Sequence, residues 1–132
     1  MHDRSRRAAG LKARRRVLGR AHVERAQART TPLTADFQDL ITRYAWGEIW
    51  TRPGLDLRTR RVLVLGTLVA LRLFDEFALH ARAALDEGGF TEAEVAEVVL
   101  QQAVYCGVPA AHAAFEALGR VVDERKAGRR RT

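Results

Sequence analysis

A glutamate and a histidine one helical turn apart are the residues of this sequence best suited to move a proton. Glu76 and His80 are four positions apart in a segment whose apolar residues recur with helical spacing, which places both side chains on one face of a helix. A carboxylate beside an imidazole fixes the tautomer of the ring and raises its basicity. The spacing therefore favours a general acid–base pair, with a surface polar pair as the alternative.

Two arginines are suited to bind an anionic ligand. Arg52 lies in a turn that follows Trp50 and is closed by Pro53-Gly54, and an arginine on a rigid turn can hold a carboxylate in a bidentate manner. Arg60 lies near the start of an apolar helix, where a guanidinium must be paired or must face a cavity. The alternative for either arginine is a structural ion pair.

The remaining candidates carry weaker signals. His22 is interpreted as a packing or interface residue, although a histidine on an N-terminal arm can also complete a site. Tyr105 ends a predicted helix, and Trp50 is expected in a pocket wall. Cys106 is the one cysteine of the chain, which excludes an internal disulfide and a two-cysteine redox or zinc motif. With no adjacent base, it is expected to be a small buried residue, and the sequence contains no convincing metal cluster.

The composition indicates a folded, helical protein. A length of 132 residues points to one domain, and 47% hydrophobic with 30% charged residues excludes wholesale disorder. The net charge of +7 is concentrated in arginine-rich ends, which are interpreted as solvated tails or helix faces rather than a nucleic-acid-binding arm. The longest apolar run, residues 62–71, is too short to cross a bilayer, and no secretory signal is visible. A cytoplasmic protein without a membrane or nucleic-acid partner is expected.

The hydrophobic periodicity predicts an all-α fold without strands. Residues 1–30 are expected to form a helical arm broken near Gly19, residues 31–126 the main helical domain, and residues 127–132 a basic tail. Within the main domain, Thr34 and Asp56 are expected to begin helices, and Thr91 with Glu94 to form a capping box. The helix from residue 56 to about 73 is apolar around most of its circumference, which predicts a central buried helix. The expected helices of the main domain span about 34–52, 56–73, 75–87, 91–105 and 109–125.

Five separate motifs follow one another in order along the chain, within a resemblance to a known family that covers about Arg7 to Val122. They are Arg14-Arg15-Arg16-Val17-Leu18-Gly19 with Ala21-His22-Val23; Trp46-Gly47-Glu48-Ile49-Trp50-Thr51-Arg52-Pro53-Gly54-Leu55 with Arg58-Thr59-Arg60; Glu76-Phe77-Ala78-Leu79-His80 with Arg82-Ala83-Ala84-Leu85; Thr91-Glu92-Ala93-Glu94 with Glu97; and Tyr105-Cys106-Gly107-Val108-Pro109-Ala110-Ala111. With these motifs the chain resembles the carboxymuconolactone decarboxylase family, whose members include 4-carboxymuconolactone decarboxylases.

The resemblance implies an alkylhydroperoxidase-D-like fold of about six helices, assembled as a trimer or hexamer. Thiol peroxidases of that superfamily carry two cysteines before a histidine, and Leu73 and Glu76 occupy those positions here, so the decarboxylase branch is implied. The implied reaction is cofactor-free conversion of 4-carboxymuconolactone to 3-oxoadipate enol-lactone and carbon dioxide, in the protocatechuate branch of the β-ketoadipate pathway.

In this reaction the conjugated lactone takes up the electrons that carbon dioxide leaves behind, so no cofactor or metal is needed. His80, positioned by Glu76, is expected to deliver the proton. Arg52 or Arg60 is expected to bind the acetate arm. Trp50, Tyr105 and His22 are expected to complete the substrate site. The alternatives are an alkylhydroperoxidase-like oxidoreductase, a small basic nucleic-acid-binding protein and a non-enzymatic assembly module.

Overall fold

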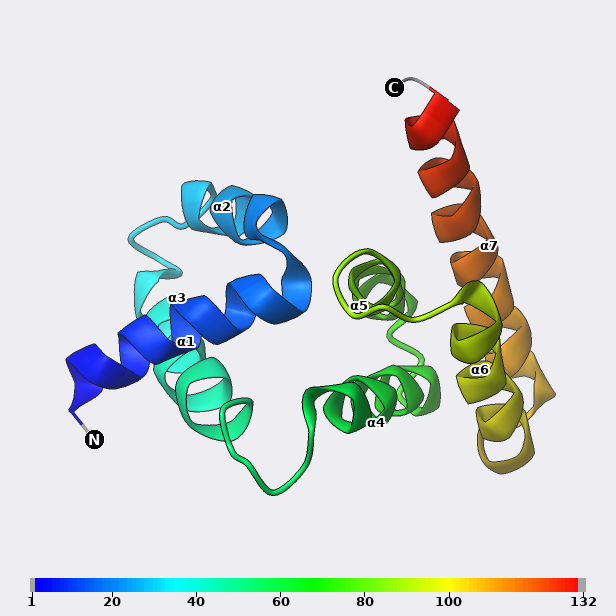
Figure 1. Cartoon of the computed structure of the whole chain (residues 1–132), viewed down its shortest axis with the longest axis horizontal. Helices are drawn as coiled ribbons and strands as arrows, with labels where there is room; N and C mark the ends of the chain where they lie inside the picture. The colour runs from blue at the N-terminus through cyan, green and yellow to red at the C-terminus, as the bar shows by residue number, and fades with distance from the viewer. Residues whose placement is uncertain (1, 131–132) are drawn as a thin grey trace. The chain divides into compact units, whose positions relative to one another are not determined.

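The computed structural model describes residues 2–130, which form helices and connecting turns without a β-strand (Figure 1). The all-α prediction is therefore confirmed. Contacts within the chain divide it into two compact units, residues 1–60 and 61–132. This division differs from the predicted boundaries after residues 30 and 126, and residues 1, 131 and 132 of the predicted arm and tail lie outside the described residues.

The first unit is organised by α1 (Asp3–Leu18), which packs against η1 (Thr42–Ile49), a segment of π-helix. Gly19, with a φ of 89°, separates α1 from α2 (Arg20–Ala28), and this confirms the predicted break. A short helix, α3 (Ala35–Ile41), continues directly into η1. The wider winding of η1 was not predicted, because its apolar residues fit an ordinary helical spacing equally well.

Two glycines allow the backbones of α1 and η1 to touch. A Cβ atom on Gly10 would collide with the carbonyl oxygen of Thr42, and one on Gly47 would collide with the carbonyl oxygen of Arg6. Only glycine leaves room for so close a contact between two helices. The two glycines therefore set the distance and the register of α1 on η1.

Ion pairs on Asp39 of α3 reinforce this arrangement. Its carboxylate accepts a hydrogen bond of 2.7 Å from Nε of Arg43 in η1 and lies 3.1 Å from Nε of Arg7 in α1. The hydrogen bond from Arg43 is the main cause that lowers the pKa of Asp39. The carboxylate thus links three helical segments, although its exposure to water limits what it adds to stability.

The second unit contains most of α4 (Leu57–Ala70), together with α5 (Phe74–Asp86), α6 (Glu92–Cys106) and α7 (Val108–Arg130). Helices α5 and α6 both pack on α7, and Figure 1 shows α6 running beside α7. Phe77, Val95 and Val99 are fully buried at their contact, together with a row of alanines along α7. The small side chains on α7 let the other helices approach it closely.

Most of the predicted helix starts are confirmed. The amide of Thr59 donates to the carboxylate of Asp56 at 2.7 Å, and Thr91 and Glu94 form both hydrogen bonds of the capping box. The prediction for Thr34 is wrong in one respect, because its hydroxyl bonds to Thr31 and not to the first turn of α3. The chain turns at residues 31–34, and the Thr34 hydroxyl bonds to the backbone amide and carbonyl of Thr31 within that turn.

The prediction that α4 is a central buried helix is wrong for the single chain. Only one stripe of α4 is buried, and Val62, Leu63 and Leu71 are 40%, 54% and 63% exposed. The pattern indicated correctly that α4 is apolar on most sides. Within residues 2–130, the apolar side chains on the other sides of α4 stay exposed to solvent.

Replacement of Gly10 by alanine tests the close contact between α1 and η1. The new methyl group must push the two backbones apart, so we expect Gly10→Ala to lower the free energy of unfolding by about 1–3 kcal/mol. Urea denaturation followed by circular dichroism measures this change. The matched control is Gly119→Ala in α7, where an added Cβ meets no atom within 4 Å and should stabilise the helix by up to about 1 kcal/mol. A Gly10→Ala protein as stable as wild type would contradict the proposed role of the contact.

Candidate active site

The predicted acid–base pair lies on α5. Glu76 is in the first turn of the helix and is exposed, and His80 is half-buried one turn later. The neighbouring positions Phe77, Ala81 and Ala84 point into the core of the second unit and hold the helix in place. His80 is thus neither sealed in the core nor fully in solvent. A half-buried imidazole on a fixed helix can exchange a proton with a bound molecule.

Trp50 and Arg52 line a pocket of about 410 Å³ in the first unit. The indole of Trp50 stacks on the buried Trp46 of η1, with the ring centroids 5.1 Å apart. The hydroxyl of Thr51 donates to the carbonyl of Gly47 at 2.9 Å. These two contacts fix the chain directly after η1, so the wall that carries Arg52 is anchored to the helix below it.

Arg60 contacts the backbone of this wall and does not line the pocket itself. Its Nη2 atom donates to the carbonyl oxygen of Arg52 at 3.0 Å, and Arg60 is not among the residues that line the pocket. Its Nε atom is buried without a hydrogen-bond partner. In this structure Arg60 braces the backbone of Arg52, and direct binding of a carboxylate by Arg60 stays a prediction.

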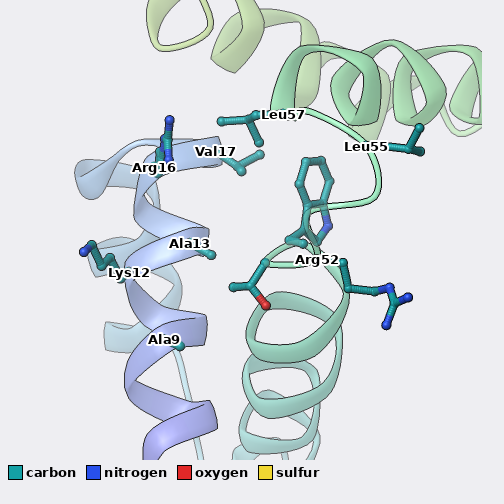
Figure 2. A pocket seen from close by; sticks show the side chains of 10 residues that line it. Ala9, Lys12, Ala13, Arg16, Val17, Arg52, Leu55 and Leu57 are labelled. Atoms are coloured by element: carbon teal, nitrogen blue, oxygen red, sulfur yellow. The ribbon is translucent and has the colours of Figure 1, made fainter.

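The opposite wall of the pocket comes from α1 and adds two cations that the sequence reasoning missed. Ala9, Ala13 and Val17 make an apolar row along the helix, and Lys12 and Arg16 stand beside them. Figure 2 shows this row facing the turn that carries Arg52, whose guanidinium is directed away from α1. The basic N-terminal stretch was interpreted as solvated, although the spacing of Lys12 and Arg16 by one turn beside small residues was a usable signal.

His22 and Tyr105 are not placed in this pocket. His22 is half-buried on α2, and burial, followed by the charges of Arg14, Arg25 and Arg29, lowers its pKa. Tyr105 is 78% exposed at the end of α6. Their predicted contacts with substrate therefore remain predictions.

The structure brings together part of the predicted site. Trp50, Arg52 and Arg60 are neighbours in the first unit, whereas Glu76 and His80 belong to the second. Within the described part of the chain, no three acidic, histidine or cysteine side chains gather as metal ligands would. Among residues 2–130, every helix is too short or too polar to cross a bilayer.

Two buried arginines also escaped the sequence reasoning. Arg14 is 8% exposed and donates from Nη1 to Oε1 of Gln38 at 3.2 Å, while burial lowers its pKa. Arg61 is 3% exposed and packs against Gly88. Both lie in arginine clusters, where the sequence does not reveal which member points inward.

Comparison with known proteins gives a consistent result. The model of the carboxymuconolactone decarboxylase family matches residues 35–119. The chain is 47% identical over 100 residues to a nitrosuccinic acid decarboxylase of Metarhizium robertsii, covering 76% of this chain and 69% of that protein. It is 41% identical over 115 residues to a 4-carboxymuconolactone decarboxylase of Acinetobacter baylyi, covering 87% of this chain and 85% of that one.

The lowered pKa of His22 predicts a specific dependence of stability on pH. Because the folded state holds His22 in its neutral form, the unfolded chain takes up a proton there more readily. The contribution of His22 is present above the ordinary histidine pKa of about 6.5 and is lost as the pH falls below it. We expect wild type to lose more stability than His22→Gln between pH 7.5 and pH 5.0 in urea denaturation. The same loss in both proteins would contradict the prediction.

Proposed function

The chain belongs to the carboxymuconolactone decarboxylase family and is a decarboxylase, and from this premise we propose that its substrate is 4-carboxymuconolactone. The all-helical chain fits the alkylhydroperoxidase-D-like fold of that family. The observation that carries the substrate proposal is the pocket lined by Lys12, Arg16 and Arg52, with no acidic residue among the described residues of its wall. A site of this charge suits a small molecule with two carboxylates.

The chemistry needs little from the protein beyond binding and one proton. The bond between the ring carbon and its carboxylate breaks, and carbon dioxide leaves. The electron pair moves through the ring double bond onto the carbonyl oxygen of the lactone and forms a dienolate. A proton then adds to the carbon beside the lactone carbonyl, which gives 3-oxoadipate enol-lactone. The acceptor is part of the substrate, so the protein has to bind the acid, exclude water and supply the proton.

His80 is proposed as the proton donor, with Glu76 as the group that orients it. The support is their spacing of one turn on α5 and the half-buried position of the imidazole. A histidine can change its charge near neutral pH without a large shift of its pKa, which suits a group that must be reprotonated in each turnover. The place of this reaction in protocatechuate breakdown, within the cytoplasm, is part of the same proposal.

Nitrosuccinic acid is the second candidate substrate. It is favoured by the 47% identity to the nitrosuccinic acid decarboxylase of Metarhizium robertsii. The two acids share a pattern, since the carbon that would lose carbon dioxide carries both an electron acceptor and a CH2-carboxylate arm. In nitrosuccinic acid the nitro group would take the electrons. A pocket that binds the carboxylate of the CH2-carboxylate arm would therefore suit either acid.

We also propose that the chain assembles as a homo-oligomer, a trimer or a hexamer. The support is the uncovered apolar surface of α4, where Val62, Leu63 and Leu71 are 40%, 54% and 63% exposed. A soluble monomer rarely leaves several large apolar residues in one uncovered region.

Activity of His80 variants tests the proposed reaction. We expect purified wild type to consume 4-carboxymuconolactone without an added cofactor, and His80→Ala to lower kcat by about 10²- to 10⁴-fold, the usual contribution of a general acid. Loss of lactone and formation of enol-lactone are followed by proton NMR. The matched control is His112→Ala, which removes a histidine that is exposed on α7, and Cys106→Ala should also keep most of the activity. Near wild-type turnover of His80→Ala would remove His80 from the mechanism.

The mass of the particle tests the proposed assembly. Light scattering after gel filtration should show three or six copies for wild type, and Leu63→Glu should shift the protein toward smaller species, because a charge cannot be buried in an apolar contact. Thr67→Glu, one turn further along α4 in the same hollow, should act in the same direction. A monomeric wild type would contradict the proposal.

A further inference from the structure

The pocket of the first unit is lined by both apolar and cationic side chains. Its floor consists of Ala9, Ala13 and Val17 from α1, with Trp50 and Leu57 opposite. The cations are Lys12 and Arg16 on α1 and Arg52 on the turn after η1, and in Figure 2 the charged ends of Lys12 and Arg52 are directed away from each other. All three are exposed. Long exposed side chains reorient on the nanosecond scale, so the charged ends of Lys12 and Arg52 can turn toward a bound anion, and Arg16 can do so by exchanging its present partner for the anion.

Only one of the two walls of the pocket lies within the residues that the family model matches. Residues 35–119 match the family model, and these include the wall with Trp50 and Arg52. Helix α1 (Asp3–Leu18) precedes the first matched residue. Lys12 and Arg16 therefore lie outside the residues that the family model matches, and Arg16 belongs to the Arg14–Gly19 motif by which the chain resembles the family.

Electrostatics decides which carboxylate of the substrate suits such a site. A cation bound to the departing carboxylate would stabilise the reactant more than the transition state, because that negative charge moves into the electron acceptor. Such contact would slow the reaction. A cation bound to the carboxylate that stays interacts equally well before and during the reaction, so it improves binding without slowing the chemical step.

We infer that Lys12 and Arg16, together with Arg52, form the binding site for the carboxylate arm that the substrate keeps. This inference rests on the proposed function and extends it. The site selects acids with a second carboxylate on a short arm and leaves the identity of the electron acceptor open. Lys12 and Arg16 are binding residues in this assignment and take no part in proton transfer.

Steady-state kinetics on 4-carboxymuconolactone tests the assignment. The variants are Lys12→Met and Arg16→Met, which keep an apolar stem and lose the charge, and Lys12→Arg, which keeps the charge. The matched control is Arg4→Met, which removes one exposed positive charge from the same helix outside the pocket. We expect KM to rise about tenfold for each charge-removing variant, as for the loss of one charged hydrogen bond, with kcat within about twofold of wild type.

Arg4→Met should keep the wild-type KM, and Lys12→Arg should raise KM less than Lys12→Met does, which distinguishes a local contact from a general effect of net charge. A KM for both methionine variants of the pocket within twofold of Arg4→Met would overturn the assignment. So would a loss confined to kcat, since this result would place the two residues in the chemical step.

A second measurement separates this inference from the proposed function. If wild type consumes neither 4-carboxymuconolactone nor nitrosuccinic acid, the proposed function fails, and calorimetric titration with succinate then judges the site alone. Binding of succinate that is lost in the Lys12→Met/Arg16→Met double variant and kept in Arg4→Met would support the site. Equal binding by all three proteins, or no binding by wild type, would overturn it.

Discussion

The contact between the backbones of α1 and η1 is the constraint on which the pocket depends. Gly10 and Gly47 leave no side chain between the two segments, so α1 lies directly on η1. The same register brings the apolar row of α1 opposite the turn that follows η1. Stacking of Trp50 on Trp46 and the hydrogen bond from Thr51 then fix that turn. The shape of the pocket thus follows from the absence of two methyl groups.

The pocket is defined chemically by its positive charge. Three cations line the pocket, no acidic residue is among its lining within residues 2–130, and this charge suits an anion with an apolar body. A decarboxylation whose electrons are taken up by the substrate itself places modest demands on the protein. The cationic pocket belongs to the first unit, and Glu76 and His80 belong to the second.

The sequence predicted what depends on local patterns and missed what depends on burial. Helix periodicity, Gly19 as a break and the capping box of Thr91 are local, and the structure confirms them. Arg52 was found because a turn after Trp50 is visible in the chain. The contribution of Lys12 was missed because an exposed basic helix and a pocket wall have the same composition, and only the packing of α1 on η1 distinguishes them. The role of α4 was misjudged for a related reason, since an apolar pattern does not say which surface covers it.

The position of the new proton in the product tests the central claim most directly. Wild-type protein is mixed with 4-carboxymuconolactone in heavy water, without an added cofactor, and the product is examined by NMR early in the reaction. Decarboxylation through a dienolate predicts release of one carbon dioxide per lactone and one deuterium on the carbon beside the lactone carbonyl. Lactone that is recovered unchanged, or a decarboxylated product without deuterium at that carbon, would contradict the account.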